Sequence, residues 1–340
     1  MSSPTISDVA LAAGVSTATV SRVLSGSPRV SPHTASKVRT AAQQLGYRVN
    51  PIARALRKNA TGSIGLIVPS ISNPFFTMLV DEVEQHMVNL GLNLYLCTSR
   101  DDVGIEAARL SALAQGAVDG ILVSPCDTVG SGPGLAAANR LVPVVQLDRS
   151  ARDVDTDWVG LDDMHAMDAA IGHLASLGVR STVLITSNER NSSSQLRTIA
   201  SRAACTRHGV ELIGVLEGAF APDWGRTAVQ SLLAAGPLPE AIVCADDQIA
   251  TGVLGELTRC GVDVPGDVRL TGLDDIPHAG LLTPGLTTVR QPIAGIAAEA
   301  VRLLQSLLAH PGRSRAPIRT TLRGELVVRG STVAESRDGW

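Results

Sequence analysis

Aromatic residues are scarce in this chain of 340 residues, which contains three Trp, two Tyr and three Phe. A hydrophobic fraction of 44% still excludes a largely disordered chain, because it supplies enough apolar surface to offset the entropy lost on folding. The cores are therefore expected to consist of Ala, Val, Leu and Ile. Each Phe is accordingly a candidate functional residue, and the length predicts two or three domains.

Other absences restrict the class of protein further. No apolar run approaches the roughly 20 residues that span a membrane, and the N-terminus does not begin with a basic-then-apolar signal segment. The cysteines include no C-x-x-C pair and the histidines are dispersed, so neither a metal site nor a cofactor is expected. We expect a cytoplasmic protein that does not enter the membrane. Its cysteines are expected to be buried thiols: Cys97, Cys126, Cys205, Cys244 and Cys260.

Positive charge is concentrated at the start of the chain. Residues 1–62 contain eight Lys or Arg residues against a single acidic residue, Asp8, whereas the whole chain has a net charge of −3. A small basic segment on an otherwise acidic chain is typical of an arm that binds a polyanion. A solvated basic face is the alternative, and charge alone does not distinguish the two.

The basic segment is predicted to contain three short helices. Ile6–Ala13 has apolar residues at helical spacing and is followed by Gly14 as a helix stop. Ser16 is a suitable N-cap for a helix over Thr17–Leu24, and Ser31-Pro32 begins a third helix. Because a short turn containing Gly joins the first two helices, they match a helix-turn-helix.

In a helix-turn-helix, the first residues of the second helix face the base edges in the major groove of DNA. Here these residues are Thr17 and Ala18, with Arg22 one turn later. Arg can bind guanine through two hydrogen bonds, and the methyl groups of Thr and Ala suit the thymine methyl. Further predicted DNA contacts, for which helix capping is the alternative role, are Thr5, Ser16, Thr19 and Ser21.

A fourth helix is predicted to begin at Asn50-Pro51 and to continue to Lys58. A helix of this length is marginal by itself, so we expect it to fold on contact with a partner. Its charges suit DNA, and Leu56 is a typical apolar wedge for a step in the minor groove. The alternative is a plain linker helix whose Leu56 packs on the rest of the protein.

These segments resemble the headpiece of the lactose-repressor (LacI/GalR) family of bacterial transcription regulators. The resemblance is carried by Ile6–Ala10, Ala13–Leu24 and Leu45–Leu56, and it extends through nearly the whole chain. It implies that Thr17, Ala18 and Arg22 read the major groove. It also implies hinge-helix contacts to DNA at Asn50, Ala53 and Leu56, the last two in the minor groove. Because helix-turn-helix dimers match two-fold symmetric half-sites, we expect a homodimer on a near-palindromic operator of double-stranded DNA.

From residue 64 onwards, short apolar strands alternate with segments of helical spacing. The predicted strands are Ile64–Val68, Leu92–Cys97, Gly120–Val123, Val142–Leu147, Thr182–Thr186, Glu211–Leu216, Ala241–Cys244 and Val268–Leu273. This alternation predicts parallel sheets that are covered by helices on both faces. Ligands of such folds bind beyond the carboxyl ends of the strands.

Polar or aromatic residues follow five strands of this pattern. They are Asn73-Pro74-Phe75-Phe76, Asp148-Arg149, Asp246-Asp247-Gln248, Asp274-Asp275 and Gln291-Pro292. We expect these groups to meet at one edge, although each single case is also explained by a helix cap or a turn. Their donors and acceptors suit vicinal hydroxyls, and Phe rings can cover the apolar face of a sugar ring. A buried polar site of this kind discriminates sharply between hydroxylated ligands.

The second part of the chain resembles the periplasmic sugar-binding fold of the same family, most closely the members similar to ribose-binding proteins. The resemblance implies an effector such as a pentose or hexose, in contact with Asn73, Phe75, Phe76, Asp148, Arg149, Arg197, Phe220, Asp246, Asp274 and Gln291. The chain departs from the family at two places. The family often has Asn at the position of Asp246, which bears on the identity of the sugar. It usually has Gly-Phe where Ala200-Ser201 stand, which concerns helix packing.

The fold class that follows is an all-α helix-turn-helix headpiece and hinge helix, joined to an α/β body of two doubly wound parallel-sheet lobes. The expected bounds are 1–48 for the headpiece, 49–62 for the hinge helix and linker, and 63–340 for the effector-binding and dimerisation domain. Lobe 1 is expected over 63–160 and 290–322, and lobe 2 over 161–289 and 323–330. The predicted function is that of a DNA-binding transcriptional regulator, a repressor, whose operator affinity is controlled by an effector bound between the lobes.

Two other functions are weighed against this one. A sugar-binding transport receptor would share the second part of the chain, but neither the basic segment nor the missing signal segment fits it. A Rossmann-type enzyme would need G-x-G-x-x-G after the first strand, where Pro69-Ser70-Ile71 stands, so no enzyme is expected. Gly130–Gly134 lacks a P-loop Lys and is predicted to be a flexible loop. Trp158 and Trp224 are expected either at the rim of the ligand site or in the core.

Overall fold

The computed structural model describes residues 4–24, 29–47, 60–310, 312 and 315–334. The chain separates into two compact units, Met1–Thr61 and Gly62–Trp340, which we call the headpiece and the body. The predicted hinge helix, with Asn50, Ala53 and Leu56, lies outside the described residues. Its structure and its DNA contacts therefore stay predictions.

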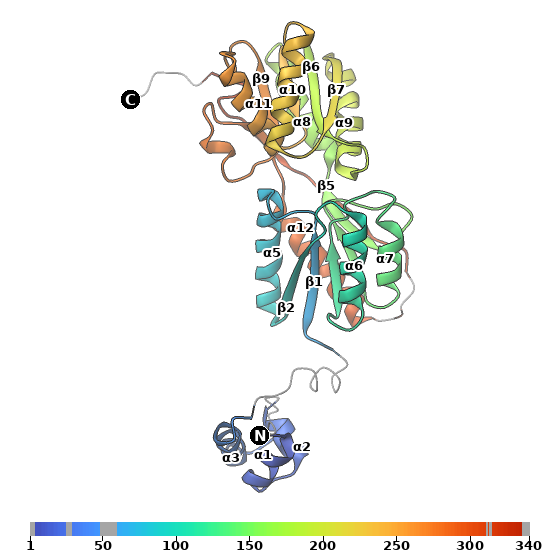
Figure 1. The fold of residues 1–340 in the computed structure, drawn as a ribbon, viewed down its shortest axis with the longest axis vertical. Helices are drawn as coiled ribbons and strands as arrows, with labels where there is room; N and C mark the ends of the chain where they lie inside the picture. The colour runs from blue at the N-terminus through green and yellow to red at the C-terminus, as the bar shows by residue number, and fades with distance from the viewer. Residues whose placement is uncertain (1–3, 25–28, 48–59, 311, 313–314, 335–340) are drawn as a thin grey trace, which may run out of the picture. The chain divides into compact units, whose positions relative to one another are not determined.

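The described residues of the headpiece form three helices (Figure 1), which are α1 (Ile6–Ala13), α2 (Thr17–Leu24) and α3 (Pro32–Gln44). Thr5 caps α1, because its hydroxyl accepts from the backbone N–H of Asp8 while the Asp8 carboxylate accepts from the backbone N–H of Thr5. Gly14 ends α1 with a φ of 66°, a left-handed conformation that Gly adopts without steric cost. Ser31 caps α3, and the three predicted helices are confirmed.

The headpiece core is aliphatic. Val9, Val20 and Val38, one from each helix, are fully buried, and Val23 and Ala41 join them. Apolar side chains three or four positions apart lie on one face of a helix, so these residues of α1, α2 and α3 meet in the centre. The core fixes α1 and α2 against each other and leaves the other face of α2 open to solvent.

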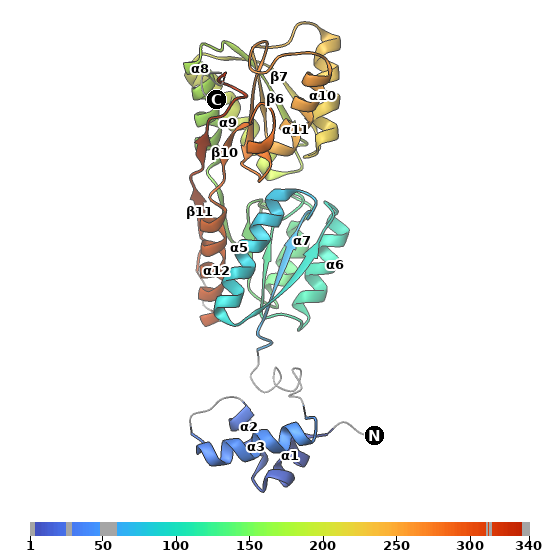
Figure 2. The same ribbon diagram turned by 90° about the vertical axis from the view of Figure 1, so that its left-hand side faces the viewer.

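In the part of the body that the structure describes, the strands form two sheets of six strands each (Figures 1 and 2). The first sheet has the order β11 (Arg319–Leu322), β5 (Asp157–Leu161), β4 (Val144–Leu147), β3 (Gly120–Val123), β1 (Ser63–Val68) and β2 (Asn93–Thr98). All its neighbouring strands are parallel. Because β1, β3, β4 and β5 are buried along their whole length, both faces of this sheet must be covered.

The second sheet has the order β12 (Glu325–Val327), β10 (Thr287–Arg290), β9 (Arg269–Asp274), β8 (Ala241–Cys244), β6 (Ser181–Ser187) and β7 (Glu211–Gly218). Its strands are parallel except β12, which pairs antiparallel with β10 at the edge. The eight strands predicted from the sequence are therefore present, with bounds shifted by no more than two residues. They belong to two sheets, so the predicted strand ends meet from two edges and not from one.

Helices cover both faces of each sheet (Figures 1 and 2). Those that contact the first sheet are α5 (Pro74–Leu90), α6 (Val103–Ala114), α7 (Gly132–Asn139) and α12 (Ile293–Ala309). Those that contact the second sheet are α8 (Asp163–Ser176), α9 (Ser192–His208), α10 (Pro222–Ala235) and α11 (Asp247–Arg259). A short 3-10 helix, η1 (Ala279–Leu281), precedes β10. Alternation along β1 illustrates the layering, since Leu66 packs with Leu79 of α5 and Ile67 packs with Leu110 of α6.

The chain passes between the two lobes more than once within the described residues. It crosses from β5 to α8, returns from β10 to α12, and crosses again between β11 and β12. The lobes are therefore joined by several short segments and not by a single linker. Such connections allow the lobes to close over a ligand by small changes in a few backbone angles.

Some sequence-based expectations are wrong. Gly130–Gly134 is not a flexible loop, because α7 begins inside it at Gly132, with Pro133 in its first turn, where a missing N–H costs nothing. Cys97 is only half-buried and Cys260 is exposed, whereas Cys126, Cys205 and Cys244 are buried thiols as expected. The edge strands β11 and β12 and the strand β5 were not foreseen, because β11 has polar residues and β5 begins with Asp.

Candidate functional site

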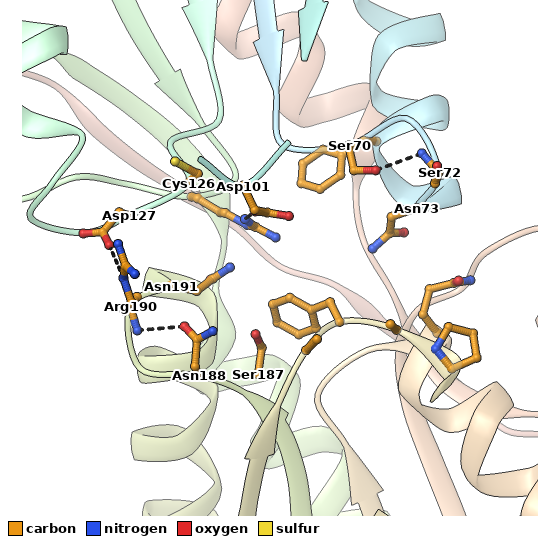
Figure 3. Close-up of a pocket in the computed structure, with 17 residues that line it drawn as sticks. Ser70, Ser72, Asn73, Asp101, Cys126, Asp127, Ser187, Asn188, Arg190 and Asn191 are labelled. Atoms are coloured by element: carbon orange, nitrogen blue, oxygen red, sulfur yellow. Dashed lines mark hydrogen bonds and ion pairs between the residues drawn. The ribbon is translucent and has the colours of Figure 1, made fainter. Parts of the chain in front are cut away.

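A cavity lies between the two lobes of the body. Its larger part, which we call the outer chamber, has a volume of about 450 Å³. Figure 3 shows Ser70, Ser72 and Asn73 on one side of it, and Ser187 and Asn188 of the second lobe on the other. A smaller part, the inner chamber, measures about 20 Å³ and shares Asn73, Phe76, Arg149 and Phe220 with the outer one.

The inner chamber brings together side chains from many points in the sequence. Its lining consists of Asn73, Phe75, Phe76, Asp148, Arg149, Ser193, Arg197, Phe220, Asp246, Asp274 and Gln291. All ten side chains that the sequence analysis names as effector contacts are in this set, together with Ser193, which it does not name. Their proximity is a finding of the structure, whereas their role in binding an effector stays a prediction.

The secondary structure explains why these side chains meet. Asn73 caps α5 directly after the β1 loop, and its side chain accepts from the backbone N–H of Phe75. Asp148 follows β4, Asp246 caps α11 after β8, and Asp274 is the last residue of β9. In parallel sheets, such positions fall at the carboxyl ends of the strands, where binding sites form. Here the carboxyl ends of both sheets contribute to one cavity.

Two of these positions have unusual backbone conformations. Asp148 has a φ of 60° and Asp274 has a φ of 124°. Positive φ is uncommon for residues other than Gly, and such strain concentrates at functional sites. The surrounding structure therefore holds the backbone of both residues in these uncommon conformations.

Arg149 connects the two lobes through aromatic contacts. Its guanidinium carbon lies 5.3 Å from the ring centre of Phe76 in the first lobe and 5.6 Å from that of Phe220 in the second. The side chain also donates to Asp101 at 2.9 Å. Two of the three Phe residues thus frame a slot that accommodates a planar cation, and the contacts have cation–π geometry. Phe75 packs edge-on against Phe76, with 5.1 Å between ring centres.

Arg197 projects from α9 into the most buried part of the cavity. Its Nε donates to Asp163 at 3.0 Å and its Nη1 to the carbonyl oxygen of Ala245 at 2.6 Å. Burial acts to lower the pKa of Arg197, but the charges of Asp163, Asp274 and Asp148 outweigh it, so the pKa is raised. The guanidinium therefore remains charged and holds the acidic residues around it together.

Burial changes the protonation of the carboxyl groups around this site. It raises the pKa of Asp246 to about 7 and that of Asp163 to about 6. Burial also raises the pKa of Asp148, and it raises that of Asp274 well above its usual value. Carboxyl groups taken out of water favour the neutral form unless a cation compensates them. The available cations, Arg149 and Arg197, compensate them only in part.

Two buried acceptors in the inner chamber have no hydrogen-bond partner among the described residues. They are Oδ2 of Asp246 and Oε1 of Gln291, whose residues are only 1% and 3% exposed. The other oxygen of Asp246 accepts from the backbone N–H of Ile249, and the Gln291 amide donates to Asp274 at 2.7 Å. Buried polar groups are rarely left without partners, so these two atoms indicate a surface shaped for a ligand with hydrogen-bond donors.

The outer chamber contains residues that the sequence analysis did not single out. Arg190, after β6, donates to Asp127, after β3, at 2.6 Å, and this ion pair joins the two lobes. The backbone N–H of Thr128 also donates to the carbonyl oxygen of Arg190. Ser192 accepts from the backbone N–H of Ser150 at 2.9 Å. The sequence does not predict these contacts, because each joins residues of two different lobes that lie far apart in the chain.

Trp158 and Trp224 do not line either chamber. Trp158 is 5% exposed, and its Nε1 donates to the carbonyl oxygen of Asp148 at 3.2 Å. Trp224 packs beside Gly218, and its Nε1 donates to the carbonyl oxygen of Thr186 at 3.0 Å. Both side chains therefore pack in the core and hydrogen-bond to the backbone near the site. Of the two expected positions, the core is the one observed.

The headpiece presents the predicted DNA-reading residues to solvent. Thr17, Ala18 and Arg22 are exposed on α2, opposite the buried Val20 and Val23. Ser16 accepts from the backbone N–H of Thr19 at 3.2 Å and so caps α2. Ser16, Thr19 and Thr5 therefore have local capping partners, and Ser21 is half-buried. The open face of α2 is available to a major groove.

Neither metal chemistry nor membrane insertion is indicated by the described residues. No group of three or more His, Cys, Asp or Glu side chains there could hold a metal ion. No helix in the part of the chain that the structure describes is long and apolar enough to cross a membrane. A helix-turn-helix unit on the same chain as a two-lobed α/β body with a polar cleft defines a ligand-responsive DNA-binding protein.

Comparison with known families supports this class. Residues 5–50 match the family described as bacterial regulatory proteins, lacI family. Residues 171–332 match the family described as periplasmic binding protein-like domain. The first match covers the helix-turn-helix and the second covers most of the second lobe.

Similarity to known proteins extends over nearly the whole chain. The HTH-type transcriptional repressor PurR of Haemophilus influenzae (strain PittEE) is 32% identical over 333 residues, which are 96% of this chain and 98% of the relative. The ribose operon repressor of Escherichia coli (strain K12) is 32% identical over 309 residues, covering 90% and 94%. A structure of the Lac repressor dimer bound to operator and the anti-inducer ONPF has a TM-score of 0.87 at 25% identity, covering 98% and 100%. A complex of the regulator CelR with cellobiose has a TM-score of 0.72 at 30% identity, covering 96% and 99%.

The chain belongs to the LacI family of bacterial regulatory proteins. It is a DNA-binding transcriptional repressor of that family, with a helix-turn-helix headpiece and a periplasmic-binding-protein-like body. The prediction that it is not an enzyme is confirmed, because its relatives are transcriptional repressors. Repressors of this family bind DNA operators and small-molecule effectors as dimers.

Proposed function

We propose that this repressor binds a near-palindromic operator as a homodimer and that an effector held between its lobes changes its operator affinity. The observation that supports the effector site most strongly is the gathering of ten side chains from both lobes around one chamber. A ligand can shift operator affinity only if it binds the DNA-competent and DNA-incompetent states with different affinities. Closure of the lobes supplies that difference, since the inner chamber is completed by residues of both.

The effector class that fits best is a sugar such as a pentose or hexose. Asn73, Asp148 and Gln291 offer the donors and acceptors that vicinal hydroxyls need, and Phe76 and Phe220 offer ring faces for the apolar side of a sugar. The inner chamber alone measures about 20 Å³, so the ligand extends into the outer chamber. The names of two similar proteins support this effector class, because one is a ribose operon repressor and the other is a CelR–cellobiose complex.

A second candidate effector is a planar base, such as a purine or a nucleoside. The specific observation in its favour is the position of the Arg149 guanidinium, a planar group, between the rings of Phe76 and Phe220. A heterocycle that replaced the guanidinium would stack against the same two rings. The many carboxylates of the inner chamber favour the sugar, because a base offers few donors to them.

At the DNA, we propose that Thr17, Ala18 and Arg22 read base edges in the major groove. Supporting contacts are proposed from Thr5, Ser16, Thr19, Ser21 and the hinge-helix residues Asn50, Ala53 and Leu56. The proposal includes a headpiece over 1–48, a hinge over 49–62 and a body over 63–340. A repressor acts where its operator is, so we infer a cytoplasmic protein.

The test combines a ligand screen with a pair of variants. A panel of pentoses, hexoses and nucleosides is screened by thermal shift, because a ligand that binds only the folded state raises its melting temperature. Operator affinity is then measured by fluorescence anisotropy on duplexes selected from a random library, with and without the compound that binds. We expect a sugar to bind and to change operator affinity.

The two variants separate the two sites. Phe220→Ala should abolish the thermal shift and leave effector-free operator affinity unchanged, since Phe220 lines the cavity of the body. Arg22→Ala should leave the thermal shift intact and weaken operator binding by about 1–3 kcal/mol, with relaxed preference at one base pair. An operator affinity that no bound compound changes would contradict the proposed regulation. Equal loss of both activities in Phe220→Ala would assign Phe220 to the core.

A further inference from the structure

The inner chamber and its immediate surroundings contain more negative than positive charge. Four carboxylates are at least nine-tenths buried there, namely Asp148, Asp163, Asp246 and Asp274. They share two buried guanidiniums, Arg149 and Arg197. Uncompensated charge in a medium of low dielectric constant is costly, so such a site must acquire positive charge or bind protons.

Both guanidiniums already have acidic partners outside the chamber lining. Arg197 donates to Asp163 at 3.0 Å, and Arg149 donates to Asp101, whose side chain is 57% exposed, at 2.9 Å. The distance from Arg149 Nε to Asp148 Oδ2 is 3.9 Å, which is an ion pair without a hydrogen bond. The carboxylates that line the chamber are therefore compensated only in part by the protein itself.

Asp246 is the carboxylate that the protein compensates least. One oxygen accepts from the backbone N–H of Ile249 as the N-cap of α11, and the other has no partner among the described residues. Its neighbour Asp247 differs in this respect, because it accepts from the Thr288 hydroxyl at 2.7 Å and from the backbone N–H of Ile276 at 2.9 Å. Asp246 lines the inner chamber, and its second oxygen is buried without a donor among the described residues.

Gln291 supplies a second acceptor of the same kind. Its amide nitrogen donates to Asp274 at 2.7 Å, which leaves the amide oxygen as the remaining polar atom of the side chain. The amide oxygen then has no donor among the described residues. The chamber lining therefore contains two buried acceptors, one of them on an ionisable carboxyl group, which the N–H donors of a ligand would satisfy.

An ammonium group meets these requirements better than a hydroxyl group. It carries a positive charge and three donors, whereas a hydroxyl is neutral and donates once. Hydrogen bonds between an ammonium and a carboxylate are charge-assisted and stronger than those between neutral groups. The rings of Phe76 and Phe220, which already contact the cation of Arg149, also favour positive charge at their faces.

We infer that the effector is a polyhydroxylated compound that carries a protonated amine, such as an amino sugar, and that its ammonium group donates to Asp246. The inference rests on the proposed effector site and specifies its ligand class. The hydroxyl groups of the compound bind the remaining polar side chains of the chamber. The excess negative charge of the inner chamber selects the amine over the corresponding neutral sugar.

The experiment compares sugars in matched pairs on the full-length protein. D-glucosamine, D-galactosamine and D-mannosamine are each paired with the parent sugar, which has a hydroxyl in place of the amine, and N-acetyl derivatives remove the charge but keep the nitrogen. Dissociation constants are measured at pH 7 by isothermal titration calorimetry. For at least one pair, we expect the amine to bind about ten- to a hundredfold more tightly than the parent sugar and the N-acetyl derivative.

The variant Asp246→Asn isolates the charge. Asn is as good an N-cap as Asp, so α11 should keep its start, which circular dichroism and the melting temperature check. We expect the variant to lose the preference for the amine, so that the ratio of the parent-sugar to the amine dissociation constant falls about tenfold. Asp263→Asn, an exposed carboxyl-to-amide change elsewhere in the second lobe, is the matched control and should change neither affinity.

Several outcomes would overturn the inference. If every parent sugar binds as tightly as its amine, the charge of Asp246 does not select the ligand, although the proposed sugar site stands. If a nucleoside binds and no amine does, the planar-base candidate is favoured instead. If Asp246→Asn weakens the amine and the parent sugar equally, Asp246 has a structural role. Failure of the proposed function is distinct, because it appears as an operator affinity that no bound compound changes.

Discussion

The two chambers of the cleft differ in how the protein treats charge. In the inner chamber, Arg197 is 3% exposed and Asp163 is 8% exposed, and their ion pair is shielded from water. In the outer chamber, the side chain of Arg190 is 73% exposed although it pairs with Asp127 at a similar distance. The carboxylate is buried in both ion pairs, and the pairs differ in their arginine, which is buried in one and exposed in the other.

The contribution of each ion pair to the stability of the folded state depends on its exposure to water. A buried pair is costly to assemble and very costly to break, because removal of one partner leaves the other charge without compensation. An exposed pair contributes at most about 1 kcal/mol, because water and salt screen it. We therefore assign recognition of the ligand to the inner chamber and adjustment of lobe closure to the outer one.

The largest expected effect comes from removal of the buried cation. Arg197→Leu should lower the free energy of unfolding of the body by about 3–5 kcal/mol at pH 7, because Asp163, Asp148 and Asp274 lose their shared partner. The loss should shrink at pH 5, where these carboxyl groups bind protons more readily. Urea denaturation monitored by circular dichroism measures both values.

The matched control for this variant is Arg190→Leu. It removes the same group from the exposed ion pair and should change the free energy of unfolding by less than about 1 kcal/mol. Similar losses in the two variants at pH 7 would contradict the contrast between the chambers. They would mean that the inner carboxylates are compensated by other means.

An intermediate effect is expected in the pH dependence of stability. Burial raises the pKa of Asp246 from 3.8 to about 7, with Asp247 acting in the same direction and Arg197 and Arg149 in the opposite one. A raised carboxyl pKa means that the folded state binds the proton more tightly than the unfolded state. The resulting stability is fully present below about pH 4 and is lost as the pH rises through about 7.

The comparison of wild type with Asp246→Asn isolates this contribution. Asp163, with a pKa raised by burial to about 6, is present in both proteins. The two melting temperatures should agree at pH 5, where Asp246 is neutral. At pH 8 the variant should melt about 2 °C higher, the change that about 1 kcal/mol produces in a domain of about 280 residues. Parallel pH profiles would show that Asp246 is not buried as a neutral acid.

Much of this site could be predicted from the sequence, because short sequence patterns mark the strand ends and helix caps that carry its side chains. Asn73 and Asp246 follow short apolar strands, and both turn out to be N-caps at the carboxyl ends of those strands. The headpiece helices follow equally from caps and stops such as Ser31 and Gly14. Strand ends and helix caps depend on a few neighbouring residues, so a single sequence carries them.

Other features could not be predicted, because they depend on contacts between distant segments. The edge strand β11 is polar, and only its pairing with β5 makes it a strand. The ion pair of Arg190 and Asp127 requires the two lobes to meet. The excess of buried carboxylates is likewise invisible in the sequence, which does not show which Asp residues are buried.

The smallest expected effect concerns closure of the lobes in the outer chamber. Arg190→Ala removes an ion pair that joins the lobes, so the closed state loses about 0.2–1 kcal/mol relative to the open state. Effector affinity should fall by up to about fivefold, and the melting temperature without effector should stay unchanged.

Arg226→Ala is the control, because Arg226 pairs with Asp223 inside the second lobe and does not join the lobes. An equal loss of affinity in both variants would mean that surface charge in general, and not the interlobe ion pair, controls closure. If Arg190→Ala loses effector affinity at low salt but not at high salt, and Arg226→Ala loses none, closure depends on the ion pair of Arg190 and Asp127. Salt screens the exposed charge of Arg190, whereas it leaves the buried ion pair of Arg197 nearly unaffected.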